Sequence, residues 1–167
     1  MTRITRGKSR LLIGAAPLAH LIANSLASHP METGGVLLGW REQNAVRIVR
    51  ALTVPSPDRG RARYLRSKAA AETAIEAALA DEKDPLVGYV GEWHSHPRIS
   101  TSSVQDRREM QSLSALAEFP LALIVAAITK RGMRTKISGL ILHAGRQLPT
   151  TVTTFDGTTK QKGIDDV

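Results

Sequence analysis

The sequence predicts an α/β domain in which a single mixed β-sheet is flanked by helices. The chain has 167 residues, the length of one ordinary domain, and its content of 42% hydrophobic and 23% charged residues is typical of a globular protein. Apolar stretches of strand length alternate with stretches of helical periodicity, which is the pattern of a sheet covered by helices. Aromatic residues make up only 4%, so we expect a core built mainly from Leu, Ile, Val and Ala.

The first apolar stretch, residues 11–19, follows several basic residues and could be interpreted as a secretion signal. Gly14 and Pro17 interrupt it and His20 follows it, which favours a short strand over residues 10–13 and then a helix from about Pro17. Apolar residues recur every three to four positions along that helix. The stretch is far shorter than the roughly 20 apolar residues that cross a bilayer, so we expect a cytoplasmic protein.

Two strands are predicted next, at residues 34–39 and 46–54, the first from a continuous apolar run and the second from its β-branched residues. Residues 55–66 form a predicted loop with a basic cluster. The cluster comprises Arg59, Arg61, Arg63 and Arg66. Ser67 can cap a helix that continues to about residue 81.

Residues 86–94 predict a central strand, and a polar loop separates it from a helix over about 103–118. Residues 121–128 and 137–143 predict two further strands, of which the first is almost wholly apolar and so buried on both faces. After residue 148 the composition changes to Thr, Gly, Lys and Asp. We therefore expect a domain over residues 1–148 and a mobile tail over residues 149–167.

Cysteine is absent, which excludes a disulfide framework, a thiolate zinc site and a cysteine nucleophile. The net charge of +8 favours an acidic partner, whether nucleic acid, anionic lipid or an acidic protein surface. Few aromatic side chains are available for base stacking, and the arginine cluster is better explained as a solvated loop or as a contact with an acidic substrate. We expect neither a membrane nor a nucleic acid as partner.

The most informative residues are His94, His96 and Asp106. On an extended strand, side chains two residues apart point to the same face, so the two imidazoles can bind one ion. Two neutral nitrogens and one carboxylate leave a fourth tetrahedral position for water, which is the pattern of a catalytic zinc site. The pKa of such a water falls from about 15.7 to roughly 7. Glu32 and Ser103 are candidates for proton transfer and for stabilising an oxyanion.

Each of these residues also has a purely structural interpretation. Paired histidines on a strand are commonly surface residues, and Ser103 with Asp106 matches the capping box of a helix start. The capping and ligand interpretations can hold together, because a capped first turn would fix the carboxylate that faces the metal. Glu32 by itself would be an ordinary surface acid.

The order of these residues resembles the signature of the JAMM (JAB/MPN+) metalloprotease family. The residues around the two histidines, 88–97, look most like its prokaryotic JAB branch. The matching segments are Glu32 in Glu-Thr-Gly-Gly-Val-Leu-Leu-Gly, then His94-Ser95-His96-Pro97, then Ser103-Val104-Gln105-Asp106. The resemblance implies a JAB/MPN (cytidine-deaminase-like) fold with one Zn²⁺ per chain held by His94, His96 and Asp106. It also implies Glu32 as general acid/base and Ser103 as the hydroxyl that helps to stabilise the tetrahedral intermediate. The loop between His96 and Asp106 is one residue shorter than is commonest in the family.

The resemblance implies a zinc metalloprotease that cleaves an isopeptide or peptide bond after the C-terminal glycine of a ubiquitin-like protein. The expected partners are that protein or its conjugate, and the ubiquitin-activating and ubiquitin-conjugating-like enzymes of a bacterial conjugation or antiphage system. A peptidase that matures a sulfur-carrier protein is an alternative with the same site. A non-catalytic scaffold or binding module of MPN type is another, and the presence of all five motif residues argues against it.

Overall fold

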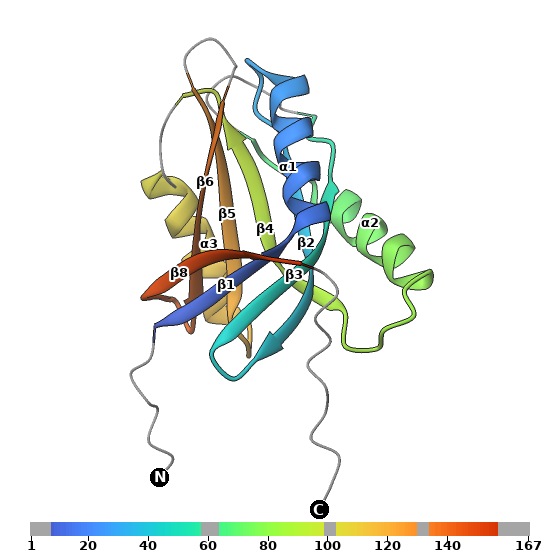
Figure 1. Ribbon diagram of the computed structural model, residues 1–167, viewed down its shortest axis with the longest axis vertical. Coiled ribbons are helices and arrows are strands. Elements are labelled where there is room, and N and C mark those ends of the chain that lie inside the picture. The colour runs from blue at the N-terminus through green and yellow to red at the C-terminus, as the bar shows by residue number, and fades with distance from the viewer. Residues whose placement is uncertain (1–7, 58–63, 99–102, 130–133, 157–167) are drawn as a thin grey trace, which may run out of the picture.

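The computed structural model describes residues 8–57, 64–98, 103–129 and 134–156. The elements are β1 (Ser9–Gly14), α1 (Ala15–Ser28), β2 (Gly34–Glu42), β3 (Ala45–Thr53), α2 (Lys68–Ala80), β4 (Gly88–His96), α3 (Val104–Leu116), β5 (Leu121–Ile128), β6 (Thr135–His143), β7 (Arg146–Leu148) and β8 (Thr150–Phe155). They agree with the predicted order of strands and helices up to residue 143. The segment 11–19 lies in β1 and at the start of α1 (Figure 1).

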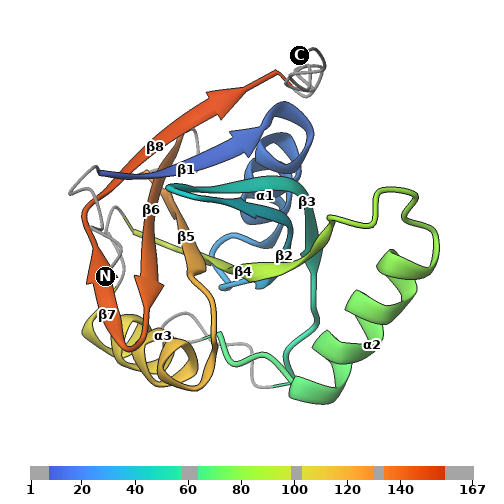
Figure 2. The same cartoon turned by 90° about the horizontal axis from the view of Figure 1, so that it is seen from below.

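All the described strands form one mixed sheet, in the order β7-β6-β5-β4-β2-β3-β1-β8. The pairs β1–β3, β1–β8 and β4–β5 are parallel, and the other neighbours are antiparallel. The sheet curls so far that its two ends approach each other (Figure 2). There the Ile141 N–H donates to Thr150 Oγ1 at 3.1 Å.

This curl corrects one part of the predicted architecture. The fold is mixed α/β with helices on both faces, but the sheet is nearly closed and α1 lies inside the curl, while α2 and α3 lie outside (Figure 2). The register of β2 shifts at Leu37/Leu38 against β4 and at Leu38/Gly39 against β3. Such bulges increase the twist of a sheet, and the periodicity of a single strand does not reveal them.

The core has an inner and an outer part because side chains alternate along each strand. In β5, Ala122 and Ile124 face the inner cluster that includes Leu21 of α1, whereas Leu121 and Leu123 pack with α3. Every residue of β5 is buried, as its continuous apolar sequence predicted. A third cluster packs α2 against the outer face of β2.

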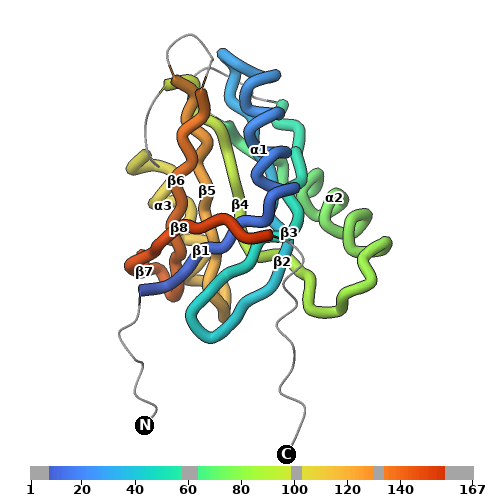
Figure 3. Tube along the Cα trace, viewed as in Figure 1, coloured from blue at the N-terminus to red at the C-terminus, as the bar shows by residue number. Residues whose placement is uncertain are grey.

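The predicted mobile tail is wrong for residues 150–155, which form β8 in parallel register with β1, from Ser9↔Thr150 to Gly14↔Phe155. Figures 1 and 3 show β8 beside β1. Thr and Val favour strands, and β1 offers its edge to them. Residues 157–167 lie outside the described chain, as do Arg59, Arg61 and Arg63 of the predicted basic loop. In the described chain, no helix is both long enough and apolar enough to span a membrane.

Candidate metal centre

His94 and His96 lie at the end of β4, near the middle of the sheet. β4 is paired with β2 on one side, where His94 lies opposite Gly34, and with β5 on the other, where His96 lies opposite Ala127. The two histidines are two residues apart and therefore share one face of the strand. Pairing on both edges holds their main chain in place.

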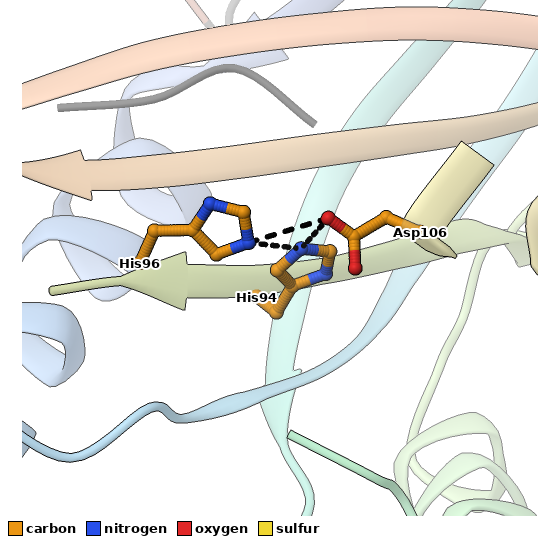
Figure 4. Close-up of side chains that lie close together, drawn as sticks. All are labelled: His94, His96 and Asp106. Carbon is orange, nitrogen blue, oxygen red and sulfur yellow. Dashed lines mark hydrogen bonds and ion pairs between the residues drawn. The ribbon is translucent and has the colours of Figure 1, made fainter. Parts of the chain in front are cut away.

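The structure brings His94, His96 and Asp106 together (Figure 4). The Nε2 atoms of the two histidines are 3.1 Å apart, and Asp106 Oδ2 lies 3.2 Å from that of His94 and 3.3 Å from that of His96. Ligand atoms about 2.0–2.1 Å from an ion at tetrahedral angles are separated by about 3.3 Å. The three atoms therefore form a triangle of the size that one small divalent cation requires.

Asp106 reaches this triangle from the first turn of α3, and a capping box holds it there. The Ser103 N–H donates to Asp106 Oδ2 at 2.6 Å, and the Asp106 N–H donates to Ser103 Oγ at 3.1 Å. The capping interpretation and the ligand interpretation thus apply to the same carboxylate. Burial opposes ionisation of Asp106, but the hydrogen bonds with His94 and His96 outweigh it and hold the pKa of Asp106 well below its usual range.

Ser103 is exposed at the N-cap of α3, where its oxygen accepts the Asp106 N–H. A serine hydroxyl that accepts one hydrogen bond can still donate its own hydrogen. Ser103 is therefore able to act as a donor beside Asp106 while it caps the helix.

Glu32 is buried and is not the ordinary surface acid that it would be by itself: only 5% of the residue is exposed. It precedes β2, and Thr33 next to it is bound to β4 by two hydrogen bonds: the Ser95 N–H donates to the Thr33 oxygen at 2.7 Å, and the Thr33 N–H donates to Ser95 Oγ at 3.0 Å. The Tyr64 main-chain N–H donates to the Glu32 carboxyl.

Burial raises the pKa of the Glu32 carboxyl above its ordinary value. His96 and His94 act in the opposite direction on the same pKa, so the three groups lie within electrostatic reach of one another. A carboxyl whose pKa is raised is a stronger base than an ordinary glutamate and can both accept and return a proton.

Two glycines after Glu32 allow this close packing. A Cβ at Gly34 would lie 2.5 Å from the Trp93 oxygen, and one at Gly35 would lie 1.8 Å from the Leu52 oxygen. No side chain fits at either position without displacing a neighbouring strand. The sequence Gly34-Gly35 therefore brings Glu32 close to the end of β4 that carries the histidines.

A groove of about 260 Å³ lies beside the candidate metal ligands, and His94 and Asp106 are among its lining residues. Residues 64–66, β4 and α3 all line this groove, and β4 contributes Glu92 and His94. The lining residues on α3 include Asp106, Glu109 and Met110. The groove and the place of Glu92 in its lining were not predicted, although Glu92 and His94 are two residues apart on β4 and therefore share one face of the strand.

Comparison with known proteins places the chain in a family. The sequence model of the family described as "Prokaryotic homologs of the JAB domain" matches residues 15–138, which is well over half of the chain and includes His94, His96 and Asp106. The chain belongs to this family. The JAB-domain chain is also 30% identical over 113 residues to a protein of Enterobacter hormaechei subsp. hoffmannii (strain UCI 50) named "CD-NTase/cGAS isopeptidase".

That match covers 65% of this JAB-domain chain and 61% of the relative, so the chain spans about three fifths of the curated relative's length. The solution structure of protein DSY2949 from Desulfitobacterium hafniense has a similar fold, with a TM-score of 0.61 over 88% of this chain and 95% of that one. The identity is 15%, so this likeness concerns the fold alone.

Proposed function

We propose that this JAB-domain protein is a zinc-dependent peptidase that cleaves after the C-terminal glycine of a ubiquitin-like protein, with an isopeptide bond as its main target. The observation that carries the proposal is the triangle of His94, His96 and Asp106 ligand atoms, 3.1–3.3 Å apart, on a family signature. The buried carboxyl of Glu32 lies within electrostatic reach of that triangle.

Zinc suits these donors because it accepts imidazole nitrogen and carboxylate oxygen in tetrahedral geometry. Three protein ligands leave a coordination position open, which distinguishes a catalytic site from a structural one. When bound, zinc supplies Lewis acidity, which polarises a carbonyl group and lowers the pKa of water.

The protein's own groups then move the proton and stabilise charge. Glu32, with its raised pKa, accepts a proton from the attacking water and returns it to the departing amine. The Ser103 hydroxyl donates to the oxygen that becomes negative when the scissile carbonyl turns tetrahedral. His94, His96 and Asp106 hold the metal, and the capping box prevents the Asp106 carboxylate from rotating away.

The groove between residues 64–66 and α3 is where we place the C-terminal tail of the substrate. His94 and Asp106 are among its lining residues, so a tail that lies along it can present its terminal carbonyl to a bound metal. The apolar lining residues Leu65, Met110 and Leu113 can contact an apolar side chain of the tail upstream of the glycine.

The named relative suggests the setting of this activity. By likeness to the CD-NTase/cGAS isopeptidase, we propose that the bond joins a ubiquitin-like protein to a CD-NTase/cGAS-type protein in a bacterial antiphage system. Ubiquitin-activating and ubiquitin-conjugating-like enzymes would form the bond that this protein removes.

The test is cleavage of three substrates by the zinc-loaded protein: a ubiquitin-like protein with a C-terminal fluorogenic amide, the same protein fused to a linear extension, and a lysine isopeptide conjugate. We expect cleavage of the amide and of the isopeptide. We expect Glu32→Gln to keep its zinc and to lose about 10²- to 10⁴-fold in kcat. Cleavage of the linear extension alone would favour the sulfur-carrier maturation peptidase. Failure to cleave any substrate at full zinc occupancy would point to the non-catalytic module.

A further inference from the structure

Residues 64–67, here called the strap, comprise the last three residues of the predicted loop and the N-cap of α2, and make several independent contacts. The Tyr64 main-chain N–H donates to Glu32, and the Tyr64 hydroxyl donates to the Val54 oxygen at 2.5 Å. Ser67 ends the strap as the N-cap of α2, where its side chain accepts the Ala70 N–H at 3.3 Å. The strap is thus attached at one end to the end of β3 and at the other to α2.

Arg66 attaches the middle of the strap to β4. Its Nε and Nη2 atoms lie 2.6 Å and 2.5 Å from Glu92 Oε1. The Tyr89 hydroxyl donates to the same oxygen at 3.1 Å. The two charged side chains are 21% and 19% exposed, so this pair is more shielded from water than an ordinary surface ion pair. Charge-assisted hydrogen bonds of this kind are roughly twice as strong as neutral ones.

This ion pair lies in the groove itself. Both Arg66 and Glu92 line the groove, together with Tyr64 on the strap and His94 on β4. Glu92 and His94 share one face of β4, because they are two residues apart. The position of the strap therefore determines both the width of the groove and the donor that holds the Glu32 carboxyl.

We propose that Arg66 and Glu92 are positioning residues for the hydrolysis: their ion pair holds the strap against β4, and the strap in turn holds the substrate tail and Glu32 in register with the metal ligands. Neither residue touches the reacting atoms. This proposal rests on the proposed function, because it assigns the groove to the substrate tail.

Charge reversal tests the proposal. Arg66→Glu and Glu92→Arg each place two like charges together, and each should lower kcat/KM by about 10- to 100-fold, as misplacement of supporting groups does. The double variant Arg66→Glu/Glu92→Arg restores an ion pair and should recover most of that loss. Zinc content should stay at the wild-type level in all three variants.

The matched control is the ion pair between Glu42 and Arg47 at the far end of β2 and β3. Glu42 also accepts a hydrogen bond from an aromatic residue, Trp40 Nε1, so it resembles Glu92 in its partners. Reversal of either charge of this control pair should leave kcat and KM unchanged. An equal loss of activity in the control variants would mean that the effect reflects general stability, and would overturn the proposal.

Hydrogen exchange separates this proposal from the proposed function. The Tyr64 amide should exchange faster in Arg66→Glu and return toward the wild-type rate in the double variant, whether or not a substrate is cleaved. Unchanged exchange in the single variants would overturn the proposal. If exchange behaves as expected but the zinc-loaded wild type cleaves none of the three substrates, the strap is held as proposed and the proposed function fails, and with it the assignment of Arg66 and Glu92 to hydrolysis.

Discussion

Asp106 uses one carboxylate oxygen both to accept the Ser103 N–H in the cap of α3 and to complete the candidate metal site with the two histidines. Asp106 Oδ2 accepts the Ser103 N–H at 2.6 Å and lies 3.2–3.3 Å from Nε2 of the two histidines. The carboxylate cannot turn away from the histidines without also losing the hydrogen bond from the Ser103 N–H that helps to cap α3. The geometry of the metal site is therefore coupled to the stability of a helix.

The first prediction concerns the metal. The wild-type protein should bind about one zinc per chain, and His94→Ala should retain little, because two remaining ligands rarely hold zinc. Elemental analysis after purification and zinc reconstitution measures both. His143→Ala is the control, because His143 is exposed at the end of β6 and should not affect the zinc content. A zinc content in His94→Ala equal to that of the wild type would remove His94 from the site.

The second prediction concerns the capping box. Ser103→Ala should lower the free energy of unfolding by about 1 kcal/mol and weaken zinc binding by about 10- to 100-fold. Ser67→Ala removes the equivalent cap of α2 and should have the same cost in stability without an effect on zinc. Denaturant unfolding and competition with a zinc chelator measure the two quantities. If both variants weakened zinc binding equally, the coupling at Ser103 would be refuted.

The third prediction is a pH dependence of stability that Glu32 causes. Its folded-state pKa is raised by burial, so ionisation of Glu32 opposes folding, and its contribution to stability is lost as pH rises through that pKa. In metal-free protein, Glu32→Gln should be more stable than wild type at neutral pH by about 0.5–2 kcal/mol. This difference should disappear below the pKa of an unfolded glutamate, about 4.3.

Thermal unfolding of chelator-treated protein between pH 4 and pH 8 measures this difference. Glu76→Gln serves as the control, because Glu76 is exposed on α2 and its substitution should have little effect at any pH in this range. If the Glu32→Gln variant were no more stable than wild type at neutral pH, ionisation of the Glu32 carboxyl would not oppose folding, and the prediction would be wrong.

The fourth prediction concerns Gly91, a glycine of β4 three positions before His94. A Cβ at Gly91 would lie 2.0 Å from the Ala122 oxygen, so Gly91→Ala must separate β4 from β5. We expect a loss of about 3 kcal/mol or more in the free energy of unfolding, together with weaker zinc binding. Gly88→Ala is the matched control on the same strand, because nothing lies within 4 Å of its added Cβ. Equal unfolding free energies for the two variants would show that β4 can shift.

The residue types and spacing of the motif predicted much of the candidate site. Side chains two residues apart share a face of any strand, so His94 and His96 had to converge once β4 formed. Ser103 and Asp106 form a capping box through contacts within four residues, which local sequence can specify. The strands and helices up to residue 143 could be predicted from hydrophobic periodicity, because that periodicity is also a property of the local sequence.

Long-range packing decided the rest. Nothing near Glu32 in the sequence indicates that it is buried, because its surroundings come from β4 and from Tyr64. Arg66 and Glu92 are 26 residues apart and meet because the tertiary fold brings the strap against β4. The curl of the sheet and the pairing of β8 with β1 depend on bulges and on a free strand edge, and a strand's own side chains do not encode which edge it will find. The sequence by itself therefore determined the candidate metal ligands and the capping box, while the tertiary structure decided the environment of Glu32, the groove and the position of the strap.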